Sequence, residues 1–335
     1  MNIIVTGGAG FIGSALIRYL INNTDHKILN IDKLTYAVNQ TSLDSVKNNK
    51  NYSFKKEDIT NKEKIYQIFE DFQPDLIFHL AAESHVDNSI KTPLEFVNTN
   101  VYGTAVMLES AHNFWNKCAK IKKETFRFLH ISTDEVYGSL KPNEFFYEDS
   151  SYDPSSPYSA SKAGSDHLVR AWIKTYGFPA MVTNCSNNYG PYQNYEKLIP
   201  LVIINDLKEK KIPIYGNGLQ TRDWLFVDDH VEALYKVMIQ GSLGETYNIG
   251  GNNQKTNVEV VDQICELLDG KINLPTHGSS SHKNLIEFVN DRPGHDARYA
   301  MNITKISNEL DWLPRTSFKT GIDKTVNWYI DNYEH

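Results

Sequence analysis

Residues 2–13 read NIIVTGGAGFIG, and this stretch decides the fold that the sequence predicts. The apolar run before Thr6 is typical of a buried strand, and a helical pattern begins at Phe11. Between them, Gly7, Gly10 and Gly13 let the backbone turn tightly and approach a pyrophosphate, while the first helical turn offers free N–H groups. A glycine cluster alone is a weak signal, but this order indicates the start of a dinucleotide-binding sheet.

Short apolar strands alternate with longer helical patterns through the first half of the chain. The expected strands are Asn2–Thr6, Lys27–Ile31, Tyr52–Lys56, Leu76–Leu80, Phe126–Ile131 and Pro179–Thr183. The expected helices are Phe11–Ile21, Lys62–Phe72, Val97–Asn116 and Ser156–Tyr176. This order predicts an α/β fold with a doubly wound parallel sheet of the Rossmann type. The pattern loosens from about Asn184, so we expect a dinucleotide-binding domain over 1–183, interleaved with a smaller, mixed substrate lobe over 184–335.

Asp32 supplies the second part of the cofactor signal. It ends the second expected strand, about 20 residues beyond the glycine loop, where an acid binds the adenosine ribose hydroxyls. A carboxylate at this place would repel a 2′-phosphate, so NAD is favoured over NADP. The competing interpretation of Asp32 is a helix N-cap or a turn residue, but the order of strand, loop, helix and acid favours NAD binding.

Tyr158 and Lys162 form a Tyr-x-x-x-Lys pair, which a helix places on one face. Tyrosine has an ordinary pKa of about 10, and a neighbouring ammonium favours its phenolate. The pair can then take a proton from a sugar hydroxyl as hydride leaves its carbon. An ordinary surface pair is the alternative, but this one follows Ser132-Thr133, at the end of the fifth strand, as in extended short-chain dehydrogenases/reductases.

Asp134 and Glu135 come directly after Thr133. Neighbouring residues of a strand point to opposite faces, so both acids can serve one site only if the strand has ended. The following Val136-Tyr137-Gly138 indicates that it has. Two carboxyl groups beside a Tyr/Lys pair suit an added acid/base step, such as elimination of water, although a solvated acidic loop is the simpler alternative.

Composition limits the other classes of function. The 335 residues are 40% hydrophobic and 22% charged, with a net charge of −7, so binding to nucleic acid or membranes is not favoured. Cys118, Cys185 and Cys265 are widely spaced, which argues against a disulfide framework or a metal site. The chain shows no signal-peptide pattern and no apolar run long enough to span a bilayer, so we expect a cytoplasmic location.

The motifs together resemble those of the dTDP-glucose 4,6-dehydratase family. The matching stretches are 80–87 (LAAESHVD), 132–138 (STDEVYG), 156–162 (SPYSASK), 184–191 (NCSNNYGP), 197–200 (KLIP), 221–224 (TRDW) and 291–295 (DRPGH). UDP-galactose epimerases and UDP-glucuronate decarboxylases share the glycine loop and the Tyr/Lys pair, but usually not the Asp-Glu pair or the late DRPGH run. The resemblance covers Asn2 to about Tyr329.

This resemblance implies a mechanism of internal hydride transfer with NAD. Tyr158, helped by Lys162, would take the proton of the glucose 4-hydroxyl, which Thr133 holds, while hydride passes from carbon 4 to NAD. Glu135 would remove the carbon 5 proton, and protonated Asp134 would release the 6-hydroxyl as water. Hydride would then return to carbon 6, giving dTDP-4-keto-6-deoxyglucose. Differing environments can give two carboxyl groups such opposite roles.

The family pattern also implies the binding residues. For NAD they are Gly7, Gly10, Phe11, Ile12, Gly13, Asp32, Lys33, Leu34, Thr35, Asp58, Ile59, Leu80, Ala81, Ala82, Thr99, Tyr158, Lys162 and Asn188. For the substrate they are Ser84, Thr133, Asn187, Lys197, Arg222, Asn257, Arg292 and His295. Guanidinium forks match phosphate oxygens, so the two arginines suit a diphosphate.

Two positions depart from the family pattern. Val38 stands where the family usually has glycine and would be strained if the backbone there needs a positive φ, and Asn88 stands where arginine is common. Both concern cofactor affinity more than catalysis.

The resemblance further implies a homodimer, with the helices over 97–116 and 156–176 pairing in a four-helix bundle. Val101, Ala105, Leu108, Leu168 and Trp172 would otherwise be plain core residues. The alternatives in function are another NAD-dependent sugar-nucleotide dehydratase or 4-epimerase and, more distantly, a non-catalytic NAD-binding regulator. No local motif indicates thymine.

Overall fold

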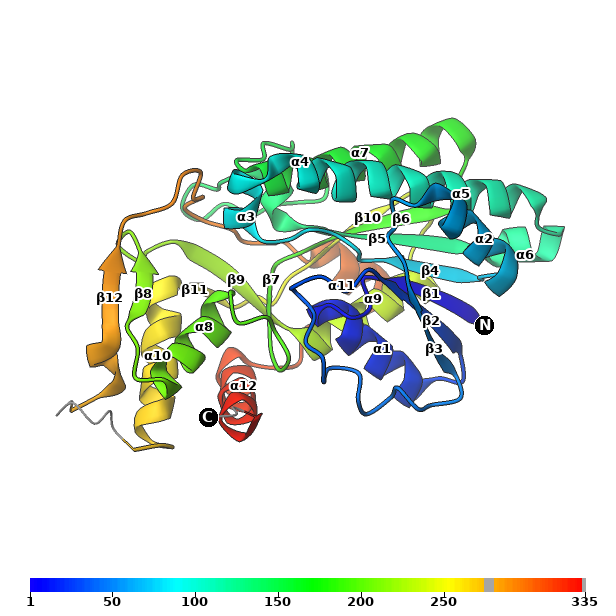
Figure 1. Ribbon diagram of the computed structural model, residues 1–335. Coiled ribbons are helices and arrows are strands. Elements are labelled where there is room, and N and C mark those ends of the chain that lie inside the picture. Colours follow the sequence, from blue (N-terminus) through cyan, green and yellow to red (C-terminus); the bar gives the residue numbers. More distant parts are fainter. Residues whose placement is uncertain (274–279, 333–335) are drawn as a thin grey trace.

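A seven-stranded parallel sheet forms the centre of the computed structural model, which describes residues 1–273 and 280–332 (Figure 1). Its strand order is β10-β6-β5-β4-β1-β2-β3, and every neighbouring pair is parallel. The strands are β1 Asn2–Thr6, β2 Lys27–Asp32, β3 Tyr52–Lys56, β4 Leu76–His79, β5 Arg127–Thr133, β6 Ala180–Cys185 and β10 Thr246–Ile249. The order runs outward from β1 in both directions, so ligands are expected beyond the carboxyl ends of β1 and β4.

Helices cover both faces of this sheet (Figure 1). One face carries α2 Lys62–Phe72, α5 Gly103–Lys117 and α7 Pro157–Tyr176, with the shorter α3 Val86–Lys91, α4 Pro93–Phe96 and α6 Lys120–Thr125. The other carries α1 Phe11–Asn23, α9 Val227–Gln240 and α11 Thr304–Leu310. Two apolar cores therefore lie on opposite sides of the sheet, for example around Leu16 and Leu234 on one side and around Phe69 and Met107 on the other. The predicted doubly wound fold is confirmed.

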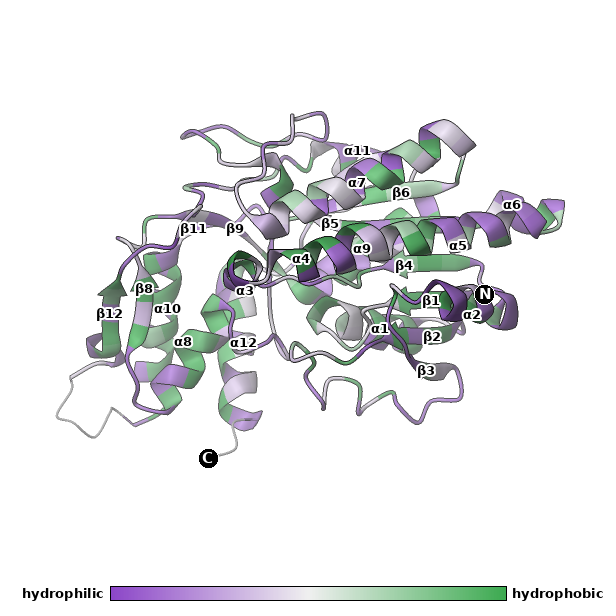
Figure 2. Ribbon diagram, turned by 45° about the horizontal axis from the view of Figure 1, so that its top comes forward, coloured by the Kyte–Doolittle hydropathy of each residue, from purple (hydrophilic) through white to green (hydrophobic). Residues whose placement is uncertain are grey.

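A smaller lobe extends the molecule beyond the carboxyl edge of the sheet (Figure 1). It contains a three-stranded mixed sheet, β11-β9-β7, and a parallel pair, β12-β8. Its elements are β7 Asn187–Tyr189, α8 Leu198–Leu207, β8 Ile212–Tyr215, β9 Thr221–Phe226, β11 Gln254–Thr256, α10 Asn257–Asp269, η3 His282–Leu285, β12 Ile286–Val289 and α12 Phe318–Asn332. Figure 2 shows hydrophobic residues on α8 and α10. Among them, Ile203 of α8 and Ile264 of α10 belong to a third apolar core.

The two parts of the chain are interleaved, as the sequence suggests. β10 follows the smaller lobe's β9 in the chain, yet it pairs with β6 at the edge of the main sheet, with Thr246 opposite Val182. The helices α9 and α11 also pack on the main sheet's core. The smaller lobe is thus fixed to the larger one by several crossings of the chain.

One expected helix is interrupted. The helical pattern over 97–116 divides into a π-helical turn, η1 Val97–Tyr102, followed by α5. Thr99 and Asn100 of this turn are buried, and the Asn100 amide donates to the hydroxyl of Ser161 on α7 at 2.8 Å. Single π turns often occur at functional sites, because the extra residue redirects neighbouring side chains.

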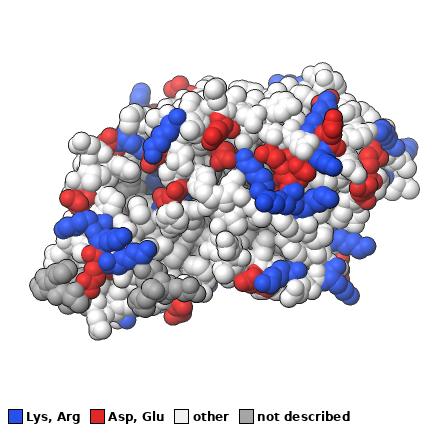
Figure 3. All heavy atoms as spheres, viewed as in Figure 1, with Lys and Arg blue, Asp and Glu red and all other residues white. Residues whose placement is uncertain are grey.

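Acidic and basic side chains are interspersed over the face shown in Figure 3. Among the residues that the structure describes, no helix has both the length and the apolar character needed to cross a membrane.

Candidate active site

A cavity of about 280 Å³ lies at the carboxyl edge of the main sheet. It begins at the glycine loop between β1 and α1, passes the ends of β2, β4 and β5, and reaches Asn187 and Lys197 of the smaller lobe. Parallel strands bring their carboxyl ends to one edge, which explains how segments far apart in the sequence meet here.

The glycine loop fits closely against its neighbours. Gly7 has a φ of +69°, and a Cβ there would lie 2.7 Å from the backbone nitrogen of Ala81. A Cβ at Gly13 would lie 2.2 Å from the carbonyl oxygen of Gly7. Helix α1 carries no side-chain cap at Gly10, so the N–H groups of its first turn are available to a ligand. These features fit the pyrophosphate of NAD.

Asp32 braces this loop from the end of β2. Its carboxylate accepts hydrogen bonds from the backbone N–H of Ala9 at 2.9 Å and of Leu34 at 2.8 Å. Leu34 has a φ of +61°, whereas Val38 is not among the residues with positive φ. The strain that would follow from a positive φ at Val38 therefore does not arise.

Replacing Asp32 by alanine is expected to weaken NAD binding by about 10- to 100-fold, since hydrogen bonds to a charged group contribute roughly 1.5–3 kcal/mol. The loss combines the ribose contact with the two backbone contacts that hold the loop. Titration calorimetry on protein freed of nucleotide would measure it. Asp44→Ala is the control, because Asp44 lies on the surface and pairs with Lys47 at 2.8 Å. Equal affinities in the two variants would contradict the role of Asp32.

Most of the residues predicted to bind NAD line the cavity. They are Gly7, Gly10, Phe11, Ile12, Gly13, Asp32, Lys33, Thr35, Ile59, Leu80, Ala81, Ala82, Thr99, Tyr158, Lys162 and Asn188. Leu34 and Asp58 do not: the Leu34 side chain is exposed, and Asp58 accepts hydrogen bonds from the N–H and hydroxyl of Thr60 before α2.

The five residues predicted to be catalytic come together in this cavity. Thr133 is the last residue of β5, and the 3-10 turn η2 Asp134–Tyr137 begins directly after it. The Thr133 hydroxyl accepts a hydrogen bond from the N–H of Glu135 at 3.3 Å. The strand has ended where the sequence predicted, which lets both acids line the same cavity.

Tyr158 and Lys162 project from the first turns of α7. A capping box between Ser156 and Ser159 starts this helix, with Pro157 in its first turn. The Lys162 ammonium donates to the carbonyl oxygen of Ile131 at 2.8 Å. Both side chains are buried, and Tyr158 packs edge-on against Phe96 with 6.4 Å between the ring centres.

The pKa of Tyr158 differs from the expectation drawn from the sequence. Burial and then the charge of Glu135 hold this pKa well above its ordinary value, and a hydrogen bond with Thr133 opposes them. Lys162 is not among the largest influences on this pKa, and its ammonium donates to the carbonyl oxygen of Ile131 on β5. The low dielectric around a buried phenol outweighs the effect expected of a neighbouring ammonium.

The two acids have different environments. Burial, followed by the charge of Glu135, raises the pKa of Asp134 well above its ordinary value, which favours the protonated form of this carboxyl. Its Oδ2 atom is buried without a hydrogen-bond partner within the described part of the chain. Burial also raises the pKa of Glu135, but Lys197, Arg292 and Arg222 oppose the rise. Asp134 is thus the better acid and Glu135 the better base.

The predicted substrate residues fall into two groups. Ser84, Thr133, Asn187 and Lys197 line the cavity, and Lys197 donates to the carbonyl oxygen of Ser84 at 3.0 Å. Arg222, Asn257, Arg292 and His295 lie outside its lining.

The two arginines outside the lining still influence the site electrostatically. Arg222 donates to the carbonyl oxygen of Asp296 at 2.9 Å and stacks on the Tyr299 ring at 4.2 Å, while Arg292 lies 3.4 Å from the Asp87 carboxylate. Both favour the charged form of Glu135 and so place positive charge near this end of the site.

Sequence reasoning missed several residues of the cavity. Glu83, which pairs with Lys33 at 3.1 Å, was not predicted as a site residue, although it lies within the matching stretch 80–87. Gln193 and Asn194 come from the loop before α8 and carry no local signal. His230 also escaped notice: it lies 2.8 Å from the side-chain oxygen of Asn188 and orients that amide. No group of side chains suited to a metal ion occurs among the described residues.

Comparisons with known proteins agree with this geometry. The model of the GDP-mannose 4,6 dehydratase family matches residues 4–325. The chain is 56% identical over 333 residues to the dTDP-glucose 4,6-dehydratase of Haemophilus influenzae, across 99% of this chain and 98% of that relative.

Two solved structures of dTDP-glucose 4,6-dehydratases are also similar. The one from Bacillus anthracis, in complex with NAD, has a TM-score of 0.87 and 45% identity, covering 99% of this chain and 97% of that chain. The one from Streptomyces venezuelae, with NAD and TYD bound, has a TM-score of 0.89 and 40% identity, covering 99% of this chain and 98% of that chain.

Proposed function

The chain belongs to the dTDP-glucose 4,6-dehydratase family, and from that membership we propose that it converts dTDP-glucose to dTDP-4-keto-6-deoxyglucose and water, with NAD as its cofactor. One observation carries the proposal. Asp134 and Glu135 lie beside Tyr158 and Lys162 in a cavity that also contains the glycine loop. A simple alcohol dehydrogenase or a 4-epimerase needs the Tyr/Lys pair but not the two added acids.

In this proposal the residues of the chain act in a defined order. Tyr158 takes the proton of the 4-hydroxyl, Thr133 holds that hydroxyl, and the Lys162 ammonium stabilises the developing phenolate. NAD, when bound, would supply the acceptor for the hydride from carbon 4 and the donor of the same hydride to carbon 6. Glu135 removes the carbon 5 proton, which the new ketone has made acidic. Protonated Asp134 then donates to the departing 6-hydroxyl, and water leaves. When the hydride is added at carbon 6, protonated Glu135 returns a proton to carbon 5, and the proton held by Tyr158 replaces the one that Asp134 lost.

The binding residues are proposed on the same basis. The sixteen predicted residues that line the cavity hold NAD, and Leu34 and Asp58 contribute from just outside it. Ser84, Asn187 and Lys197 hold the sugar, and Arg222, Asn257, Arg292 and His295 hold the nucleotide diphosphate. Residues 1–183 then form the NAD-binding domain and 184–335 the nucleotide-sugar lobe, apart from β10, α9 and α11, which pack on the main sheet.

The test is an incubation with dTDP-glucose, followed by the alkali-induced absorbance of a 4-keto product. The proposal predicts a signal with dTDP-glucose and a much weaker one with UDP-glucose or GDP-mannose. A signal with another nucleotide sugar alone would reject the substrate while keeping the reaction. A product that differs only in configuration at carbon 4 would instead identify a 4-epimerase.

A homodimer is part of the proposal. Ile90, Leu94, Val97 and Tyr102 follow one another along α3, α4 and η1 with exposed side chains, and an exposed apolar series of this kind suits a helix-to-helix interface. Leu108 is fully buried within the chain and so belongs to the core instead. Sedimentation should give a dimer, and a monomer at every concentration would exclude it. A cytoplasmic location is also proposed, since the three cysteines are free, as in proteins of a reducing compartment.

A further inference from the structure

Asp166 is a buried acid on the same helix as Tyr158 and Lys162, and the mechanism above does not use it. It lies one turn beyond Lys162 and two turns beyond Tyr158 on α7, so the three residues share one face of that helix. Its side chain is fully buried and does not line the cavity. A buried carboxylate is costly unless it is paired and hydrogen-bonded, so its surroundings indicate what it does.

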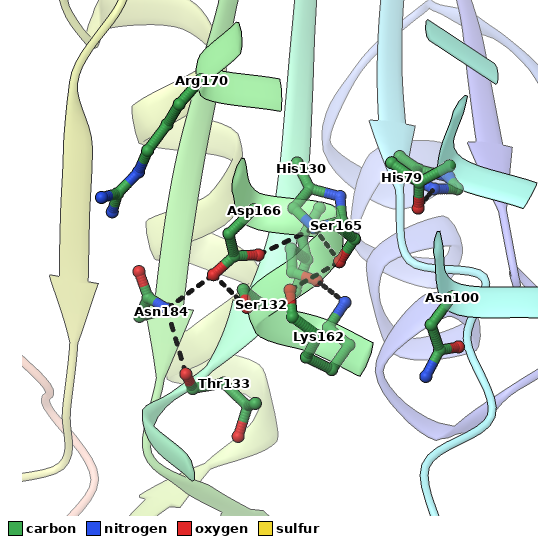
Figure 4. A network of polar contacts seen from close by, with 12 residues as sticks. His79, Asn100, His130, Ser132, Thr133, Lys162, Ser165, Asp166, Arg170 and Asn184 are labelled. Carbon is green, nitrogen blue, oxygen red and sulfur yellow. Dashed lines mark hydrogen bonds and ion pairs between the residues drawn. The ribbon is translucent and has the colours of Figure 1, made fainter. Parts of the chain in front are cut away.

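Donors from four residues converge on the Asp166 carboxylate, as Figure 4 shows for three of them. His130 lies 3.1 Å from Oδ1. Ser132 and Tyr152 donate to Oδ2 at 2.8 Å each, and Asn184 donates to it at 3.4 Å. Burial alone would raise the pKa of Asp166, but these hydrogen bonds and the charge of Lys162 lower it, so the carboxylate is anionic.

Three of the four donor residues belong to β5, which ends in Thr133, and to its neighbour β6. Ser132 directly precedes Thr133 on β5, and the Asn184 amide of β6 also donates to the Thr133 carbonyl oxygen at 3.0 Å. Lys162 itself donates to Ile131, one residue before Ser132. The carboxylate thus connects α7, the end of β5 and β6 directly behind Thr133 and Asp134.

The charges around Lys162 also indicate what Asp166 does. Lys162 is buried between α7 and the main sheet. The titratable groups of the sheet that act on it are His79 on β4, His130 on β5 and Cys185 on β6. Burial lowers the pKa of both histidines and raises that of the Cys185 thiol to about 12, so all three are neutral near pH 7.

Asp166 is then the anion, among the described groups acting on Lys162, that offsets its ammonium. On the far side of the carboxylate, the Arg170 guanidinium stacks on Tyr152 and hydrogen-bonds its hydroxyl at 3.0 Å.

We propose that Asp166 is a positioning residue of this active site, whose carboxylate balances the buried ammonium of Lys162 and holds the end of β5 in place. The inference rests on the proposed function, since it assigns Asp166 to the same reaction. Asp166 touches neither substrate nor cofactor in this role and acts through Lys162, Ser132 and Asn184.

The first test is the pH profile of Asp166→Asn, which keeps the shape of the side chain and removes its charge. Burial already lowers the pKa of Lys162 and Asp166 opposes this, so removing the charge lowers that pKa further. The ammonium is then lost at lower pH, and the alkaline limb of kcat/KM should move down by about one unit or more, as for loss of a close opposite charge. We expect kcat to fall about tenfold or more and KM for dTDP-glucose to stay within about twofold.

Tyr152→Phe is the matched control for this profile. It removes one hydrogen-bond donor from Asp166 and keeps the charge. Its alkaline limb should coincide with that of the unaltered protein. An unshifted limb in Asp166→Asn, or an equal shift in Tyr152→Phe, would overturn the electrostatic role.

A second test works without activity and covers the case in which Asp166→Asn folds poorly. Breaking one partner of a buried pair leaves an uncompensated charge, whereas removing both charges is far less damaging. The double variant Asp166→Asn/Lys162→Met should therefore have a higher Tm than Asp166→Asn alone. Additive losses of Tm would overturn the inference.

The two tests also separate this inference from the proposed function. If the unaltered protein does not turn over dTDP-glucose, the proposed function fails, but the Tm comparison still decides whether Asp166 balances Lys162.

Discussion

Replacing Tyr158 by phenylalanine is expected to lower kcat with dTDP-glucose by about 10³-fold, within the 10²–10⁴ range typical of a positioned acid or base. The change removes one oxygen atom and leaves the ring, which packs against Phe96 in a small buried cluster with Val86. The protein should therefore fold normally and retain NAD. Because the phenolic oxygen acts in the transition state, KM should change little.

A second tyrosine supplies the control. Tyr247 on β10 is also fully buried, and its hydroxyl contacts Glu309 at 2.8 Å, away from the cavity lining. The hydroxyl also accepts a hydrogen bond from the Ser242 N–H at 3.0 Å, so Tyr247→Phe should cost about 1–3 kcal/mol of stability for the two lost hydrogen bonds and leave turnover unchanged. If Tyr158→Phe turned over dTDP-glucose as fast as the unaltered protein, the catalytic assignment would fail, and the distant alternative of a non-catalytic NAD-binding protein would gain weight.

The parts of this site that the sequence predicted are those with local signals. The glycine loop and Asp32 are set by the geometry of one strand, one turn and one helix, and the structure places them as expected. The Tyr/Lys pair follows from the period of a helix. The end of β5 was also predicted, from the stretch Val136-Tyr137-Gly138, and the structure agrees, since Gly138 has a φ of +85° that a continuing strand would not adopt.

The remaining features depend on contacts between residues far apart in the chain. In the sequence, Asp166 looks like an ordinary polar residue of a helix. Its role can be inferred only from the folded structure, in which Ser132 and Asn184 donate hydrogen bonds to its carboxylate. The π turn at η1 depends on packing rather than on propensity. The high pKa of Tyr158 was also missed, because a sequence shows the neighbouring lysine but not the depth of burial.

The reaction itself depends on the two acids, and Glu135→Gln should lower kcat by about 10²–10⁴-fold, since it removes the general base. Asp134→Asn should also slow turnover strongly, for a different reason. The amide cannot donate a proton to the leaving hydroxyl, whereas burial raises the pKa of the Asp134 carboxyl and favours its protonated, proton-donating form. Both replacements are close in size to the original side chains, so a loss of activity would reflect chemistry rather than packing.

Exchange of the carbon 5 hydrogen in heavy water distinguishes the two roles. In Asp134→Asn, Glu135 can still remove that proton, so dTDP-glucose recovered after incubation should carry deuterium at carbon 5 without loss of water. In Glu135→Gln, recovered substrate should carry none, because the base is absent. The opposite pattern would exchange the two assignments. That outcome would conflict with the environments of the two groups, since Lys197, Arg292 and Arg222 favour the charged form of Glu135, while burial raises the pKa of Asp134 and favours its protonated form.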